Sequence, residues 1–286
     1  MASPRAASEA ILSNGGVDYS FRTIANLNLR GGIGKTTVSI NTATRAAQYG
    51  FKTCLLDMDS QGSASLAFDA IPEPGDPIFY DVWQKPDETV MNSLCELDEN
   101  LYLLPSSLEN GLLDSALTNP ASQKNAVRGV CEVLRANGFD LIVMDCPPSL
   151  GAAVISSICA ADTVVIPVAP DPFSIRGLEL TLGEIMSITE TFGLAPPSIT
   201  ALFNRFDKRE KMSFDALETL RRVFGDHLSP VVIRTSTDYA KALARRETIF
   251  AGFSKSQAKE DYDMFIKSLL RLDGFATRGD AGYGQG

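Results

Sequence analysis

One short segment constrains the fold of this chain more than any other: Leu29-Arg30-Gly31-Gly32-Ile33-Gly34-Lys35-Thr36-Thr37. It follows an apolar run typical of a strand and opens a segment with helical periodicity, which is the context that a phosphate loop needs. The glycines let backbone N–H groups turn toward one point, and the N-terminus of the helix adds positive potential there. We therefore expect a phosphate loop, in which Lys35 reaches the β- and γ-phosphates and the Thr36 hydroxyl holds Mg²⁺.

Two other interpretations of this segment explain less. The spacing departs from GxxxxGK[ST], because Leu29 stands at the first glycine position. A plain glycine-rich turn would explain the glycines but not the Gly-Lys-Thr-Thr run in a strand-to-helix context. A dinucleotide site would need GxGxxG, which is absent, and it would give the Lys-Thr pair no role.

Short apolar runs alternate with longer segments of helical period along most of the chain. The predicted strands are residues 23–29, 52–57, 101–104, 141–145, 163–168, 199–204 and 230–233, and the predicted helices are 36–49, 124–137, 175–191, 214–224 and 255–270. Such alternation predicts an α/β fold, a doubly wound and mainly parallel sheet with helices on both faces. Gly50 stands where the first of these helices should stop.

The 286 residues suffice for a full core, and no linker divides them. We expect a flexible arm over residues 1–20, one domain over 21–273, and a disordered glycine-rich tail over 274–286. Residues 71–100, with four prolines, are the least regular stretch and are expected to wrap the surface. The chain shows no long apolar run, no secretory signal and no CxxC pair among its five cysteines, so we expect a cytoplasmic protein with reduced thiols.

Acidic residues close two of the predicted strands. Asp145 ends an apolar run, and the carboxyl ends of strands are where doubly wound sheets place ligand chemistry. A carboxylate there can hold Mg²⁺ through water beside Thr36. Asp57 and Asp59 lie at the end of residues 52–57, in the same predicted crevice, although Asp57 could also serve only as a capping carboxylate.

Four ordered motifs resemble one family. The glycine loop is similar to the deviant phosphate loop, K-G-G-x-G-K-[ST], of the ParA/Soj/MinD ATPases. Residues 55–64 (LLDMDSQGSA) are similar to the family's D-x-D-P-Q-G segment, 139–150 (FDLIVMDCPPSL) to its Walker B and switch region, and 161–168 to a further strand. The resemblance runs from about residue 22 to 249 and is closer to the ParA/Soj branch than to MinD.

This resemblance implies an ATPase that uses Mg²⁺ and forms a homodimer around bound ATP. It implies that Lys35 and Asp59 act in hydrolysis, Asp59 on the attacking water, and that Asp57, Asp145 and Thr36 serve the metal. The nucleotide would be bound by Gly31, Gly32, Ile33, Gly34, Lys35, Thr36, Thr37 and Asn204. Asn204 ends a predicted strand and could bond the adenine, or it could be an ordinary turn residue.

Arg30 departs from the family pattern, because the family's signature residue there is lysine. In the resembling ATPases that lysine crosses the dimer to the partner's phosphates. Arginine keeps the charge and can act as an arginine finger, worth about 10³–10⁵ in rate in other phosphoryl-transfer systems. The guanidinium is longer, planar and forked, so the exchange bears on hydrolysis and on the contact across the dimer more than on nucleotide binding.

Basic residues gather in the carboxyl-terminal half. ParA-type proteins bind DNA there without sequence preference, and the candidates are Arg205, Arg221, Arg222, Arg234, Arg245 and Arg246. Acids lie among them, so a solvated surface of mixed charge is the alternative. The net charge of -9 argues against a wholly basic nucleic-acid coat. Residues 256–271 carry mixed charge, so no membrane anchor of the MinD kind is expected.

Three functions are compatible with these features. The first is a ParA-type switch at the nucleoid, which positions a plasmid, chromosome or other cargo and whose hydrolysis a ParB-like or other adaptor stimulates. The second is a scaffold that uses ATP only to dimerise, or a MinD-like positioning ATPase on another surface. The third is a small-molecule enzyme on the same fold, a synthetase or a nitrogenase-type reductase. The scattered cysteines do not supply the cluster ligands of such a reductase.

Overall fold

The computed structural model describes residues 21–272 except 74 and 253–254. The predicted arm over 1–20 and tail over 274–286 lie outside these residues. In the described chain, seven strands form one sheet in the order β3-β4-β2-β5-β1-β6-β7. Their bounds are β1 Arg22–Asn26, β2 Thr53–Asp57, β3 Cys95–Asp98, β4 Leu101–Leu104, β5 Leu141–Asp145, β6 Thr163–Val168 and β7 Ser198–Phe203.

Helices of very different length connect the strands. The α-helices are α2 Lys35–Gln48, α3 Ser63–Ala67, α4 Phe79–Val82, α5 Pro86–Thr89, α6 Leu113–Ala116, α7 Pro120–Ala136, α8 Ala152–Ala160, α9 Pro172–Thr191, α10 Lys211–Phe224, α11 Asp238–Ala244 and α12 Gln257–Leu270. Three short 3₁₀ turns join them: η1 Val90–Asn92, η2 Leu108–Leu112 and η3 Gly225–His227. No described helix is both long and apolar enough to cross a membrane.

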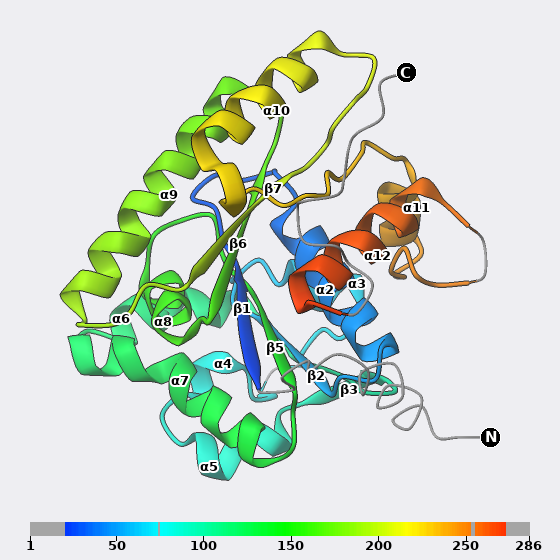
Figure 1. Ribbon diagram of the computed structural model, residues 1–286. Coiled ribbons are helices and arrows are strands. Elements are labelled where there is room, and N and C mark those ends of the chain that lie inside the picture. The colour runs from blue at the N-terminus through cyan, green and yellow to red at the C-terminus, as the bar shows by residue number, and fades with distance from the viewer. Residues whose placement is uncertain (1–20, 74, 253–254, 273–286) are drawn as a thin grey trace.

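The sheet is parallel except at β3, which pairs antiparallel with β4. Helices cover both faces: α7, α8 and α9 lie on one side of the strands and α2 and α12 on the other (Figure 1). Two apolar clusters fill these layers, one around α7 and α8 and the other around α2 and α12. Every residue of β2 and β5 is buried, as expected for parallel strands covered on both faces. The predicted fold class is confirmed.

Several parts of the fold differ from the sequence prediction. Residues 230–233 are no strand: Ser229 N and Ile233 N donate to Ala201 O and Phe203 O at 2.8 Å, but Pro230 has no N–H to extend this pairing along β7. The stretch 71–100 contains β3 and two short helices, and it does more than wrap the surface, because Phe79 and Val82 are fully buried. Helices α3, α6, α8 and α11 lie outside the predicted helices.

The first helix stops as predicted. Gly50 has a φ of 91°, a left-handed conformation that favours glycine, and its N–H donates to Ala47 O at 2.8 Å. Helix α9 begins three residues earlier than predicted, because Asp171 caps it and accepts a hydrogen bond from Ser174 N at 3.0 Å. The start of α9 therefore lies beside the carboxyl end of β6, next to the glycine loop.

Candidate nucleotide-binding site

The glycine loop connects the central strand β1 to α2. Gly34 occupies the N-cap position with a φ of 94°, and no side chain caps the helix. A Cβ at residue 34 would lie 2.6 Å from Asn204 Nδ2, so only glycine fits there. The first N–H groups of α2 are therefore left for an anion at the helix N-terminus.

Asn204 holds the loop from the end of β7. Its Nδ2 donates to Ile33 O at 2.8 Å, and its Oδ1 accepts from Arg205 N at 2.9 Å. These bonds make Asn204 more than an ordinary turn residue. Its contact with adenine stays a prediction, while its amide already fixes the loop that would bind the phosphates.

Lys35 is buried at the base of the loop. Its side-chain Nζ donates to Arg30 O at 2.9 Å, and the residue is only 7% exposed. Burial lowers the pKa of Lys35, and the nearby charge of Asp145 opposes that shift. A backbone carbonyl thus holds the ammonium within the loop. A bound phosphate could replace that carbonyl as the acceptor, because a charged acceptor forms the stronger hydrogen bond.

Three polar residues end adjacent strands in register. Asn26 of β1 pairs with Asp145 of β5, which pairs in turn with Asp57 of β2, and all three are fully buried. In the described part of the chain, both amide atoms of Asn26, Oδ1 of Asp57 and Oδ2 of Asp145 have no hydrogen-bond partner. Unpaired buried polar atoms are costly, so this row of strand ends indicates a site that binds a polar ligand.

The two aspartates of this row resist ionisation. Burial, together with the charge of Asp57, raises the pKa of Asp145 to about 7, although hydrogen bonds from Thr36 and Ser39 oppose the shift. Burial also raises the pKa of Asp57 to about 6, against hydrogen bonds from the backbone and hydroxyl of Ser65. A cation at this site would relieve the cost of ionising both groups.

The donor set fits Mg²⁺. Asp145 Oδ1 accepts from Ser39 Oγ at 2.9 Å, and Asp57 Oδ2 accepts from Ser65 Oγ and Ser65 N at 2.8 Å. One oxygen of each carboxylate is thus fixed, and the other has no partner among the described residues. Free carboxylate oxygens beside the Thr36 hydroxyl are the hard ligands that Mg²⁺ and its bound waters prefer.

Asp59 follows β2 and lines the cavity above the loop. The cavity has a volume of about 440 Å³, and its walls include Gly31, Lys35, Thr36 and Pro148. The carboxylate of Asp59 is half-buried, and its Oδ1 accepts from Gln61 N at 3.0 Å. The structure therefore brings Asp59 together with the phosphate-loop residues, as the sequence predicts.

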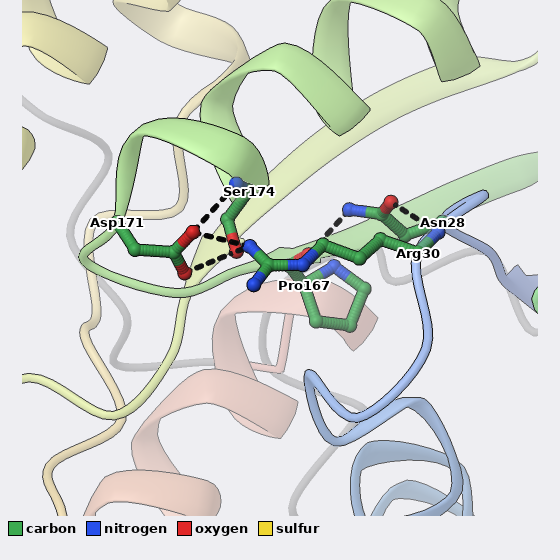
Figure 2. A network of polar contacts seen from close by, with 5 residues as sticks. All are labelled: Asn28, Arg30, Pro167, Asp171 and Ser174. Carbon is green, nitrogen blue, oxygen red and sulfur yellow. Dashed lines mark hydrogen bonds and ion pairs between the residues drawn. The ribbon is translucent and has the colours of Figure 1, made fainter.

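Arg30 points away from this cavity. Figure 2 shows its side chain extended along the first turn of α9, where the guanidinium contacts Asp171 and Ser174. Its Cζ also lies 5.8 Å from the centre of the Phe173 ring. Among the described residues, Arg30 does not line the cavity of its own chain.

The predicted DNA-binding arginines fall into two groups. Arg234 pairs with the buried Asp261, and Arg246 pairs with Asp69, so both are engaged within the chain. The others are exposed: Arg205, Arg221, Arg222 and Arg245. Within the described chain, no ion pair engages Arg205, Arg222 or Arg245. Arg205 also lines the nucleotide cavity.

Sequence reasoning missed the residues that support the site. Ser39 and Ser65 hold the buried aspartates, and Asn26 completes the row of strand ends. A polar residue at the end of an apolar run was a visible signal for Asn26, as it was for Asp145. Asp171 had a signal too, since Asp-Pro followed by Ser is typical of a helix start.

This site defines a class of protein. A glycine loop between a buried parallel strand and a helix, with acids at the ends of neighbouring strands, is the arrangement of a P-loop nucleoside triphosphatase. The family model AAA_31, described as an AAA domain, matches residues 21–195. The chain belongs to this family, within the ParA/MinD group of partition ATPases.

Named relatives agree with this assignment. The chain is 29% identical over 246 residues to the cell division protein PomZ of Myxococcus xanthus, covering 85% of this chain and 76% of that protein. It is 28% identical over 249 residues to the chromosome-partitioning ATPase Soj of Thermus thermophilus, covering 87% and 95%. The solved structure of a McdA variant from Cyanothece in complex with ATP has the same fold, with a TM-score of 0.76 at 21% identity, covering 90% of this chain and 99% of that one.

Proposed function

We propose that this protein is a ParA-type ATPase that binds ATP and Mg²⁺, dimerises around the nucleotide, binds DNA without sequence preference and positions a cargo. The single observation that carries nucleotide binding is the row of unpaired buried atoms at Asn26, Asp57 and Asp145, beside an uncapped helix N-terminus. Positive groups on one side and ionisable oxygens on the other suit a phosphate chain with its metal ion.

Each residue has a role in this proposal. The backbone of residues 31–37 and Lys35 bind the phosphates, and Thr36 with Asp145 and Asp57 holds the metal ion and its waters. Mg²⁺ neutralises charge that develops on the phosphates during transfer. Asp59, at the cavity wall, orients the attacking water. Phosphoryl transfer depends mainly on positioning and charge, so these few groups suffice.

Arg30 serves the second subunit in this proposal. Its side chain lies outside its own cavity and has a cationic end near the surface, at the position of the family's signature lysine. In an ATP-bound dimer the guanidinium would meet the partner's phosphates, and the γ-phosphate gives it a more highly charged target than ADP does. Dimerisation would then depend on ATP.

DNA binding would use the exposed arginines. Arg205, Arg222 and Arg245 fit best, because their charges are not taken up by the ion pairs that engage Arg234 and Arg246. Cationic side chains of this kind bind phosphates irrespective of sequence and release counterions. An adaptor protein of the ParB kind would stimulate hydrolysis and so return the dimer to monomers.

The test is ATP binding and dimerisation by the parent chain and by Lys35→Ala, with Lys85→Ala as the control. Lys85 is 70% exposed beside α5, away from the cavity lining, so its removal should change nothing. We expect Lys35→Ala to lose at least about tenfold in affinity for Mg–ATP, because a charge-assisted contact to phosphate disappears. Unchanged ATP binding by Lys35→Ala would refute the phosphate-loop assignment. A dimer without measurable hydrolysis would favour an ATP-gated scaffold instead.

A further inference from the structure

One end of the Arg30 guanidinium is held within its own chain. Its Nη1 donates to the carboxylate of Asp171 and to Ser174 Oγ, as Figure 2 shows. Asp171 is itself fixed, because it caps α9 and accepts from Ser174 N at 3.0 Å and Ser174 Oγ at 2.7 Å. The arginine thus binds a rigid acceptor pair rather than a mobile surface carboxylate.

The backbone and stem of Arg30 are fixed as well. Asn28, fully buried, accepts from Arg30 N at 3.0 Å and donates from Nδ2 to Pro167 O at 2.9 Å. Gly177 lets α9 approach closely, since a Cβ there would lie 3.5 Å from Arg30 Cβ and 3.1 Å from Asn28 Oδ1. The end of β6 and the first turns of α9 therefore form a cradle for this side chain.

The opposite edge of the guanidinium remains available. Within the described chain, Nε and Nη2 of Arg30 have no hydrogen-bond partner, and the side chain is 35% exposed. These two nitrogens form the fork that binds carboxylates or phosphates with two parallel hydrogen bonds. Arginine can therefore hold Asp171 with one nitrogen and still bind a second anion with the other two.

We propose that Asp171 and Ser174 are positioning residues for Arg30, which fix Nη1 so that the Nε–Nη2 edge receives a phosphate of the nucleotide bound to a second copy of this chain. This inference rests on the ATP-dependent dimer of the proposed function. A fixed guanidinium loses less conformational freedom when the phosphate binds, which strengthens the contact. A lysine at residue 30 would have one ammonium nitrogen, for which Asp171 and the phosphate would compete.

The test is a double-mutant cycle on the dimer formed with Mg²⁺ and a non-hydrolysable ATP analogue, measured by sedimentation. The variants are Asp171→Asn, Arg30→Lys and the double variant. Asparagine is as good an N-cap as aspartate, so Asp171→Asn removes the charge and keeps the start of α9. The control is Asp207→Asn, another aspartate paired with an arginine, Arg209, but outside the cradle. Nucleotide affinity of the dilute monomer and thermal melting report on the monomer itself.

We expect Asp171→Asn to weaken the dimer about tenfold when residue 30 is arginine, and to leave it unchanged or tighten it when residue 30 is lysine. Monomer affinity for the analogue should not move. Equal weakening in both backgrounds would reduce Asp171 to a helix cap and overturn the proposal. So would a tighter dimer for Asp171→Asn with Arg30 intact, because Asp171 would then hold Arg30 away from the phosphate.

Two further measurements keep the outcome decisive. Ser174→Ala removes the second acceptor of Nη1 without touching the capping carboxylate, and it should weaken the dimer in the same direction but less. If Asp171→Asn unfolds below the assay temperature, Ser174→Ala becomes the test. A Ser174→Ala dimer as tight as that of the parent chain would then overturn the proposal. A parent chain that binds the analogue and stays monomeric would overturn the dimer of the proposed function, and this inference with it.

Discussion

At the scale of the residue, the buried carboxylates at the strand ends impose opposite demands. Asp145 and Asp57 are shielded from water and close to each other, which raises the pKa of both groups. In the proposed function the same oxygens hold a metal ion, which needs them in ionised form. The site is therefore costly for the chain without a ligand and favourable for the chain with one, which makes its charge state measurable.

The stability of the ligand-free chain should fall as pH rises from about 5 to 8. Burial and the charge of a neighbouring aspartate raise the pKa of Asp145 to about 7 and the pKa of Asp57 to about 6 in the folded chain, above the ordinary aspartate value of 3.8. In this window the folded state binds more protons than the unfolded state, so its advantage is lost as pH increases. Asp145→Asn should flatten the slope, as measured by urea unfolding with a chelator present.

The control for this slope is Asp207→Asn. The Arg209 guanidinium lowers the pKa of Asp207 to about 2, so this half-buried carboxylate does not titrate between pH 5 and 8. Its removal should leave the slope as in the parent chain. If Asp145→Asn also left the slope unchanged, the buried carboxyl would be ionised throughout the window and our account of the site would be wrong.

Asp59 should matter for turnover more than for binding. Its carboxylate lines the cavity, whereas the proposed function gives the phosphate contacts to the loop and to Lys35. We expect Asp59→Ala to bind ATP within about threefold of the parent and to lose at least about a hundredfold in hydrolysis, since positioning of the nucleophile is lost. The measurement is phosphate release beside nucleotide affinity. Hydrolysis at the parental rate would move the role elsewhere, with Asp57 as the next candidate.

At the scale of the element, the sequence predicted what local chemistry determines. Residues 101–104, 141–145 and 163–168 are strands with the predicted bounds, because short apolar runs between turn signals have few alternatives. Helix α8 escaped prediction, because it is buried on nearly all sides and its apolar residues show no helical period. Strand β3 depends on its pairing with β4, and no local pattern reveals a partner.

The candidate site also contains residues that the sequence could place and contacts that it could not. The loop, Lys35, Thr36, Asp59 and Asp145 lie in motifs that sequence alone could place at one edge of the sheet. The contacts between Asn204 and Ile33 and between Arg30 and Asp171 join residues more than a hundred positions apart. Only the order of the strands brings these pairs together, and that order is a property of the folded chain.

Replacing Gly34 should break the contact between Asn204 and the glycine loop at the start of α2. In Gly34→Ala the added Cβ would meet Asn204 Nδ2 at 2.6 Å, so the bond to Ile33 O has to break. Gly193→Ala is the matched control, because its φ of 62° is also left-handed but its Cβ would meet nothing within 4 Å. We expect both variants to lose about 1 kcal/mol of stability from backbone strain.

Only Gly34→Ala should also lose nucleotide affinity, by about tenfold or more, because only that variant displaces Asn204 from the loop. Isothermal titration with Mg–ATP, beside thermal melting, separates the two effects. Equal affinities in the two variants would show that Asn204 does not hold the loop in its binding conformation.

At the scale of the whole molecule, charge is distributed unevenly. The chain has a net charge of -9, yet exposed arginines gather on the segments that follow β7, on α10 and at the end of α11. Arg205 is common to both proposed functions, since it lines the nucleotide cavity and belongs to the basic set. Through Arg205, a change at the nucleotide site would reach the cationic surface directly.

ATP, and not ADP, should therefore produce a form that is retained on DNA of any sequence. One monomer offers few free arginines on an acidic chain, and this predicts weak binding. A dimer would present the set twice, so that two weak faces act together and the affinity rises by orders of magnitude. Retention should fall steeply as salt increases, since phosphate contacts release counterions.

The assay compares retention on DNA with ATP, with ADP and without nucleotide across a salt series, and it compares Arg222→Ala with Arg246→Ala. Arg246 is held by Asp69, so its loss should matter less. Equal retention in all three nucleotide states would exclude a switch, and no retention of an ATP-locked Asp59→Ala dimer would exclude DNA as the surface on which the protein works.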